Sequence, residues 1–432
     1  MKRVLGIVLL AGVTAGLAYG VAVTEREASY GRFVEQGDAA LGRDDSSAAI
    51  EAFSVAISLK EDSMAAYLKR GEAYRRRGEF DASVRDLRRA AQIDSLSIYP
   101  RELLGDVHYA VGAAAGAGAR IRFDTAADQY REAVALDDKS ARLQYKLGLA
   151  SYRAGQLTGA IPALRQAISL DPRFAEAHYV LGICLRLTGQ PQEAVRALER
   201  AVALAPTLVP ARDELVDLYA DLRRYDARLT HLVALTGLEP GAPRERALAF
   251  GYMRAGHLDR AVGQLASAAK RYPDDMENYV ALGRLWLRRA TPGGRVELGK
   301  AFAALSKSVS TESTSEALTL LGRAYMMAGD AARAEGTLQE AVTRFPVEPD
   351  AFLSLADVAQ RRGHLEIAHR ALRDYSALVP PDALPGALLA RIGEAHLQAG
   401  DDIAARRAID AALAREPSNA LAAALKRRLA GS

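Results

Sequence analysis

The chain has 432 residues, of which 50% are hydrophobic and 25% are charged, a composition typical of folded rather than disordered proteins. Its formal net charge is +4, and Lys2 and Arg3 supply two of those charges, so a nucleic-acid partner is not indicated. A single cysteine excludes an intramolecular disulfide and a cysteine-rich metal site.

The N-terminal segment is basic at its start and then apolar. Lys2 and Arg3 precede residues 4–23, which carry no charge. A spanning helix needs about 20 apolar residues, whereas the apolar core of a secretory signal has about 7–15. We therefore expect residues 1–23 to be an apolar helix that anchors the chain in the membrane through residues 4–23. A signal peptide cleaved after Ala22 is the alternative, and residues 24–29 are expected to be a short linker.

The charges around this segment predict its orientation. Basic residues precede the apolar run, which favours an N-terminus that stays in the cytoplasm. The expected localisation is therefore the inner membrane, single-pass, with the rest of the chain facing the periplasm or the exterior. Cleavage would instead leave a soluble periplasmic protein.

From about residue 30 the sequence repeats itself with a period near 34. The spacing is set by Leu181-Gly182, Gly189, Ala194, Leu198, Ala201 and Pro206, and it recurs 34 residues earlier as Leu147-Gly148, Gly155, Ala160, Leu164, Ala167 and Pro172. Each unit is expected to be two antiparallel helices. The first glycine allows close approach of the partner helix, the second allows the turn, and proline ends the second helix. One such pair cannot bury its apolar faces alone, but stacked pairs can.

This pattern resembles the tetratricopeptide repeat family. The resemblance covers residues 30–419 and implies an all-α, right-handed superhelical solenoid of antiparallel helix pairs. We expect about eleven units, starting near residues 30, 64, 98, 141, 175, 209, 242, 276, 315, 349 and 386. Residues 419–432 are expected to be a capping helix and tail.

Three units depart from the pattern. Insertions fall within residues 110–124 and around residues 291–299, and insertions in such arrays map to loops that often touch partners; tolerated surface drift explains them equally well. The unit near residue 209 has Val216, Arg228 and Leu235 in small-residue positions, so its packing is expected to be irregular.

The motifs that could indicate a chemical function coincide with repeat positions. Gly294 to Lys300 matches the start of a phosphate-binding loop, but Ala301 stands where Ser or Thr is needed and no strand precedes it. The seven histidines occupy repeat positions without metal-site spacing. Cys184 fills a slot that holds alanine in other units, which predicts a buried, inert thiol. We expect no enzyme activity, no catalytic residue, no metal, no cofactor and no small-molecule substrate.

The expected partners are other proteins, bound along the groove that the resemblance implies for the first helices. Arginine recurs near the end of the first helix, and aromatic and arginine side chains dominate interface energetics. The candidate groove residues are Arg76, Tyr145, Tyr152, Arg153, Tyr179, Arg186, Arg254, Arg288 and Arg361.

The expected function is a non-catalytic, membrane-tethered scaffold that assembles or stabilises a cell-envelope complex. Two alternatives stay open at this point. One is a regulatory adaptor subunit of a membrane enzyme. The other is a periplasmic binder of an acidic polymer such as an exopolysaccharide, because arginine ladders can clamp carboxylates.

Overall fold

The computed structural model describes residues 2–116, 118–291 and 294–430, with side chains from residue 20 onward. Within these ranges the chain forms 23 α-helices and one 3₁₀ helix, and no strand. The chain divides into two compact units, one ending at Asp221 and the other beginning at Leu222. The all-α prediction is confirmed, whereas the right-handed superhelix expected for the whole chain stays a prediction.

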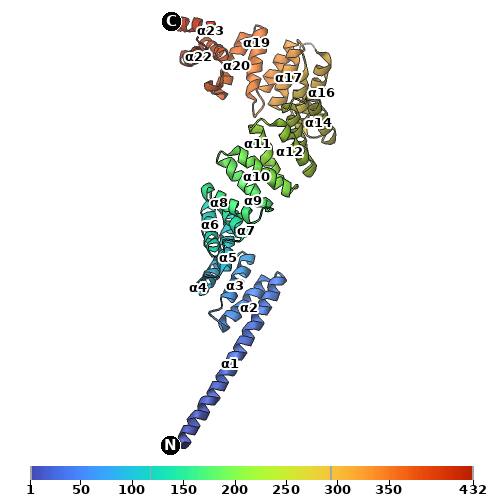
Figure 1. Ribbon diagram of the computed structural model, residues 1–432. Coiled ribbons are helices and arrows are strands. Elements are labelled where there is room, and N and C mark those ends of the chain that lie inside the picture. The colour runs from blue at the N-terminus through green and yellow to red at the C-terminus, as the bar shows by residue number, and fades with distance from the viewer. Residues whose placement is uncertain (1, 117, 292–293, 431–432) are drawn as a thin grey trace. The chain divides into compact units, whose positions relative to one another are not determined.

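The N-terminal unit is a stack of helix pairs, and the end of its long first helix forms the first pair with the second helix (Figure 1). Its helices are α1 (Lys2–Gly42), α2 (Ser46–Leu59), α3 (Met64–Arg77), α4 (Phe80–Ile93), α5 (Ile98–Ala114), α6 (Ala119–Leu136), α7 (Ala141–Arg153), α8 (Leu157–Leu170), α9 (Ala175–Leu187), α10 (Pro191–Leu204) and α11 (Val209–Asp221). The first helix of a pair contacts its partner and also the first helix of the next pair, as α7 does with α8 and α9.

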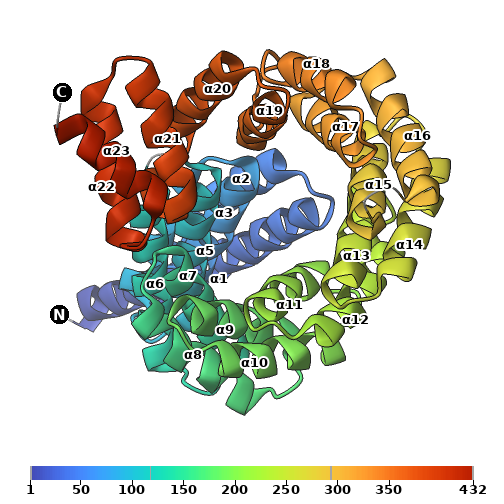
Figure 2. The same cartoon turned by 90° about the horizontal axis from the view of Figure 1, so that it is seen from above.

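The C-terminal unit repeats this arrangement. Figure 2 shows α13, α15 and α17 along its inner side and α14, α16 and α18 along its outer side. Its helices are α12 (Tyr225–Leu238), α13 (Ala242–Arg254), α14 (Leu258–Arg271), α15 (Met276–Arg289), α16 (Arg295–Thr311), α17 (Ser315–Met327), α18 (Ala331–Ala341), α19 (Pro349–Arg361), α20 (Leu365–Leu378), the 3₁₀ helix η1 (Pro381–Ala383), α21 (Gly386–Gln398), α22 (Asp402–Arg415) and α23 (Ala420–Ala430). The last helix, α23, packs on α21 and α22 through Ala422, Leu425 and Leu429.

The expected repeat register agrees with the helices. Ten of the eleven expected starting positions are the first residue of a helix, and the eleventh, residue 30, lies inside α1. The glycines act as expected: Gly182 on α9 faces Leu198 of α10, and Gly189 turns the chain between them with φ of 74°. The same contact between a first-helix glycine and a buried side chain of the second helix recurs in other pairs, with Phe53, Leu87, Leu164, Leu305 and Leu338 on the second helices.

The N-terminal helix differs from the expectation. α1 runs without a break through residues 24–29, the segment expected as a linker, and the side chains of residues 20–28 are all exposed. The side chains of residues 4–19, most of the expected span, lie outside the described residues. In the part of the chain that was described, no helix combines the length and the apolar character that a membrane crossing demands. The expected single-pass location in the inner membrane, with residues 4–23 as the span, is therefore wrong.

Helix lengths vary among the repeats. The insertion at residues 110–124 lengthens α5 and α6 to 17 and 18 residues, and α16, next to the insertion at residues 291–299, has 17. In contrast, α18 has only 11 residues, whereas α8, α10 and α14 have 14. The boundary between the two units falls between α11 and α12, the two helices of the unit near residue 209 that was expected to pack irregularly.

Candidate functional site

Four of the expected groove residues gather on neighbouring first helices of the N-terminal unit. Tyr145, Tyr152 and Arg153 lie on α7, and Tyr179 lies on α9, which contacts α7. The three tyrosines are partly exposed and Arg153 is exposed. Sequence reasoning missed a fourth tyrosine, Tyr109, which occupies on α5 the position that Tyr152 occupies on α7. We call Tyr109, Tyr145, Tyr152, Tyr179 and Arg153 the tyrosine face.

Burial and neighbouring charges shift the pKa values of two members of the tyrosine face. Burial raises the pKa of Tyr145 to about 12, and the charge of Glu176, then Tyr109, Arg153 and Tyr179, also act on it. Burial also raises the pKa of Tyr179, followed by Glu214, Tyr152 and Arg153. Tyr145 and Tyr179 are therefore neutral donors at neutral pH. The face therefore offers aromatic surface and hydroxyl groups around one guanidinium.

Packing beneath the tyrosine face holds its rings in place. The Tyr145 ring packs on Phe174 with centroids 4.6 Å apart, and the Tyr109 ring meets Phe123 edge-on at 5.1 Å. The Arg153 guanidinium lies 6.0 Å from the centroid of the Tyr152 ring. Such fixed rings lose little rotamer entropy when they bind a partner.

The remaining arginines do not join this face. Arg76 on α3 pairs with Glu72 at 3.0 Å and donates to the Leu41 carbonyl at 3.3 Å. Arg186 on α9 pairs with Glu214 of α11 at 2.9 Å. Arg254, Arg288 and Arg361 belong to the C-terminal unit, where each is exposed at or near the end of its first helix and forms no ion pair with any described residue. A ligand role for them stays a prediction.

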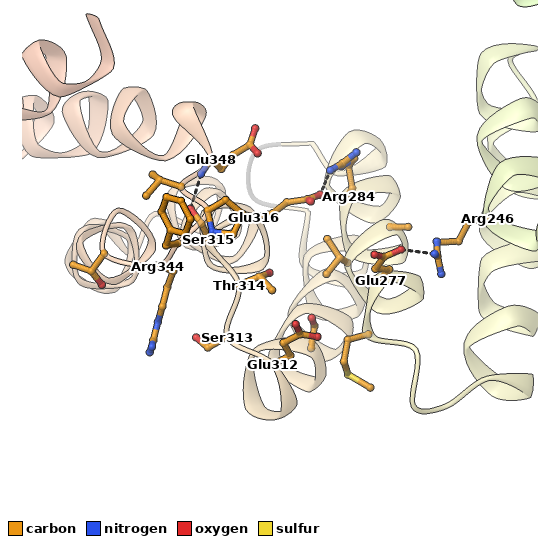
Figure 3. Close-up of a pocket in the computed structure, with 18 of the residues that line it drawn as sticks. Arg246, Glu277, Arg284, Glu312, Ser313, Thr314, Ser315, Glu316, Arg344 and Glu348 are labelled. Atoms are coloured by element: carbon orange, nitrogen blue, oxygen red, sulfur yellow. Dashed lines mark hydrogen bonds and ion pairs between the residues drawn. The ribbon is translucent and has the colours of Figure 1, made fainter. Parts of the chain in front are cut away.

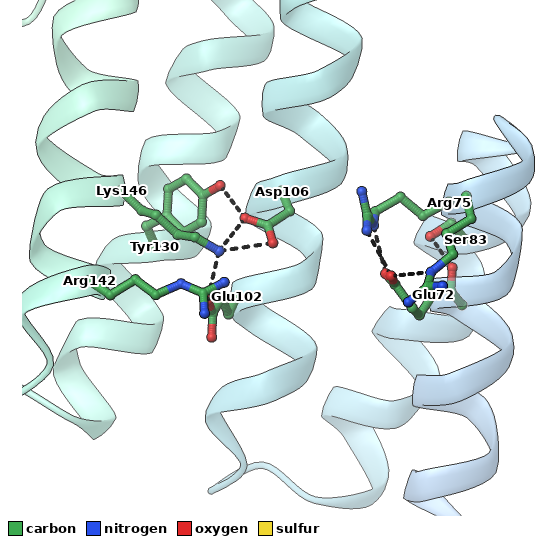
Figure 4. A network of polar contacts seen from close by, with 10 residues as sticks. Glu72, Arg75, Ser83, Glu102, Asp106, Tyr130, Arg142 and Lys146 are labelled. Carbon is green, nitrogen blue, oxygen red and sulfur yellow. Dashed lines mark hydrogen bonds and ion pairs between the residues drawn. The ribbon is translucent and has the colours of Figure 1, made fainter. Parts of the chain in front are cut away.

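A polar network ties α5, α6 and α7 together beside the tyrosine face (Figure 4). Lys146 Nζ lies 2.7 Å from Glu102 Oε1 and 2.7 Å from Asp106 Oδ1, and the Tyr130 hydroxyl donates to the same Asp106 oxygen at 2.7 Å. Burial, followed by the charge of Asp106, raises the pKa of Tyr130. These side chains are largely shielded from water, so the network fixes the spacing of the helices that carry the face.

A second surface, which sequence reasoning missed, is a groove in the C-terminal unit. It has a volume of about 890 Å³ and is lined by α13, α15, the start of α17 and the connections that follow α16 and α18. Figure 3 shows carboxylates and guanidinium groups on several sides of it, with Glu277 facing Arg246 and Glu316 facing Arg284. Its apolar lining includes Phe250, Val280 and Val347.

The segment that resembles a phosphate-binding loop, Gly294 to Lys300, does not form a loop. Gly294 is the residue before α16, and Gly299 and Lys300 lie inside that helix. Lys300 Nζ lies 4.3 Å from the centroid of the Trp286 ring, so its charge rests on an aromatic face. Cys184 is fully buried, as its repeat position predicted.

Comparison with known proteins agrees with this architecture. The profile of the family described as "Tetratricopeptide repeat" matches residues 34–98, 113–168, 152–208 and 294–349, which together cover half of the chain. No curated protein matches the chain.

Several solved structures are similar. YrrB, described as a TPR protein with an unusual peptide-binding site, has 22% identity and a TM-score of 0.39, covering 46% of this chain and 97% of its own. PilF of Pseudomonas aeruginosa has 21% identity and a TM-score of 0.38, covering 50% and 96%. The Cut9-Hcn1 hetero-tetramer of the APC/C has 12% identity and a TM-score of 0.40, covering 93% and 96%. At these scores the neighbours carry no argument about a partner. The family match and the repeated helix pairs together place the chain in the tetratricopeptide repeat family.

Proposed function

We propose that this protein-interaction scaffold binds an extended segment of a partner protein along the tyrosine face and catalyses no reaction. The observation that carries the proposal is that the neighbouring helices α5, α7 and α9 present four partly exposed tyrosines and the exposed Arg153. Tyrosine and arginine are the residues that most often dominate interface energetics.

The physical basis is a surface that is already ordered. Tyr145 and Tyr109 are held by ring contacts from below, and the Lys146 network fixes the spacing of their helices. In the proposed complex the tyrosine hydroxyls would donate to main-chain carbonyls of the bound segment. Arg153 would pair with a carboxylate of the partner, since its side chain is exposed.

Site-specific photocrosslinking tests the proposal. A benzoylphenylalanine residue in place of Tyr152 is expected to crosslink one partner protein in cells of the source organism. The same residue in place of Gln166, which is exposed on the second helix α8, is expected to crosslink none. Equal crosslinking from both positions, or none from position 152, would overturn the proposal.

A charge reversal provides the second arm. Arg153→Glu is expected to reduce the crosslinked product by about tenfold, the effect of replacing an attractive contact by a repulsive one. Arg89→Glu makes the same charge change on the exposed side of α4 and is expected to leave the product unchanged. A drop of equal size in both variants would show that net charge, and not the tyrosine face, governs binding.

A further inference from the structure

The groove of the C-terminal unit has a charge pattern that selects its ligand. Its lining contains three arginines, Arg246, Arg284 and Arg344, and four glutamates, Glu277, Glu312, Glu316 and Glu348. Every arginine is already engaged by an acidic partner: Arg246 by Asp275 at 2.7 Å and by Glu277, Arg284 by Glu316, and Arg344 by Glu340. An anionic ligand would have to displace these carboxylates.

Two carboxylates of the groove are not neutralised. Glu312 and Glu348 line it, and neither forms an ion pair with any residue in the described ranges. Glu312 follows the end of α16 and Glu348 precedes α19, so they approach the groove from two different connections (Figure 3). The main-chain amide of Glu348 donates to Ser315 Oγ at 2.9 Å, which holds that connection in place. The uncompensated charge inside the groove is therefore negative.

A buried hydroxyl supports the same conclusion independently. Ser308 lines the groove, is 1% exposed, and its Oγ has no hydrogen-bond partner among the residues that the structure describes. Buried polar atoms are rarely left unpaired, so an orphan hydroxyl at a groove wall points to a ligand that completes it. A serine hydroxyl can accept a hydrogen bond from a cationic N–H as well as donate one.

The rim of the groove adds an aromatic surface. The side chain of Phe345 is 95% exposed, although contact of an apolar ring with water is unfavourable. Guanidinium and ammonium groups are attracted to the faces of aromatic rings, with arginine used more often than lysine. Carboxylates, an acceptor hydroxyl and an exposed ring together match a basic side chain.

From these contacts we infer that the groove binds an extended protein segment that carries arginine or lysine side chains. The basic side chains pair with Glu312 and Glu348, one N–H reaches Ser308 Oγ, and the stem of the side chain or a neighbouring residue covers Phe345. This inference shares the scaffold role with the tyrosine face but uses none of its residues. The protein's net charge of +4 opposes non-specific attraction of a cationic segment, so the groove must supply the selectivity.

Fluorescence anisotropy with the full chain tests the inference. The probe is a fluorescein-labelled Gly/Ser peptide that contains two arginines, and the matched peptides replace both by citrulline, their neutral isostere, or by glutamate. The arginine peptide is expected to bind about tenfold more tightly than the citrulline peptide, as two partly exposed ion pairs of about 0.7 kcal/mol each would give. Equal binding of the arginine and citrulline peptides, or tighter binding of the glutamate peptide, would overturn it.

Variants of the groove locate the binding. Glu312→Gln with Glu348→Gln is expected to weaken binding of the arginine peptide about tenfold. Asp374→Asn with Asp402→Asn makes the same change in net charge at exposed positions outside the groove and is expected to have no effect. Circular dichroism checks that all variants fold. If both pairs of substitutions weaken binding equally, the groove is not the site.

The two proposals fail separately. Arg153→Glu is expected to leave binding of the arginine peptide unchanged, because the tyrosine face lies in the other unit. Loss of photocrosslinking with intact peptide binding would count against the tyrosine face alone. Intact photocrosslinking from position 152 without selective peptide binding would count against the groove alone.

Discussion

Gly182 and Leu198 are in such close contact that no side chain fits between them. A Cβ atom added at Gly182 would come within 2.5 Å of Leu198 Cγ and 3.4 Å of the Ala194 carbonyl oxygen. The same relationship recurs between Gly148 and Leu164, so it is a property of the repeat and not of one pair. The glycine is therefore required by the packing of the second helix against the first.

Gly182→Ala is predicted to destabilise α9 and α10. Overpacking costs about 1–3 kcal/mol, and the better helix propensity of alanine returns at most about 1 kcal/mol, so a net loss of about 1–2 kcal/mol is expected. Hydrogen exchange of the α9 and α10 amides measures it locally, which suits an array whose repeats open separately. Gly159→Ala is the control, because the added Cβ would only touch Ser151 Oγ at 4.0 Å. Unchanged exchange in Gly182→Ala would contradict the close-packing argument.

Cys184 is predicted to resist thiol reagents in the folded chain. Burial raises the pKa of its thiol from 9.0 to about 11, which lowers the thiolate population about a hundredfold at neutral pH, and burial also blocks access. The folded chain holds this proton more tightly than the unfolded chain, so stability falls as the pH rises from about 9 toward 11. Labelling with a chromogenic disulfide, native against urea-unfolded, measures the difference. Comparable rates in both states would show that the thiol is accessible.

Lys146 is predicted to couple strongly to Asp106. Both side chains are shielded, at 16% and 24% exposure, so Lys146→Met leaves Asp106 without its ion-pair partner, while Glu102 keeps Arg142 at 3.5 Å. A double-mutant cycle with Asp106→Asn is expected to give a coupling free energy of about 1–3 kcal/mol in thermal or urea unfolding. The matched cycle on Arg131 and Asp128, which are 54% and 56% exposed, is expected to give less than about 0.5 kcal/mol. Equal coupling in the two cycles would rule out a special role for the network.

Ser308→Ala and Ser83→Ala are predicted to have opposite effects. Both serines are buried, but Ser83 Oγ donates to the Gly71 carbonyl at 2.7 Å (Figure 4), whereas Ser308 Oγ has no partner within the described part of the chain. Removing the unpaired hydroxyl is expected to stabilise the unbound chain by about 1 kcal/mol, and removing the paired one to destabilise it by a similar amount. Thermal unfolding of the three proteins decides the signs. A destabilised Ser308→Ala chain would mean that its hydroxyl is already satisfied.

The sequence predicted those features that depend on spacing within one unit. Helix starts, the close-packed glycines and the burial of Cys184 all follow from local periodicity, which repeats often enough to be read without a structure. The tyrosine face was found in part, because its members share unit positions, but Tyr109 was missed in the lengthened unit near residue 98. Whether the face binds a partner is still a prediction.

Contacts between neighbouring repeats could not be predicted from the sequence. Lys146 meets Asp106, 40 residues earlier, only because α7 packs beside α5. The recurring arginines share one position, yet Arg76 pairs with Glu72 whereas Arg153 stays exposed, because the partners come from neighbouring residues that the repeat does not specify. The apolar N-terminal stretch was interpreted as a membrane span from its hydropathy alone, and the described helices do not bear that out.

The groove exists because one helix stops early. α18 ends at Ala341, about three residues before its counterparts, so residues 342–344 join the connection 345–348 in a wall that carries Arg344, Phe345 and Glu348. In an array of nearly identical pairs, a hollow can thus be made by leaving out less than one turn, without any added sequence. The residue at which a second helix ends therefore determines where along the array a ligand-binding groove can form.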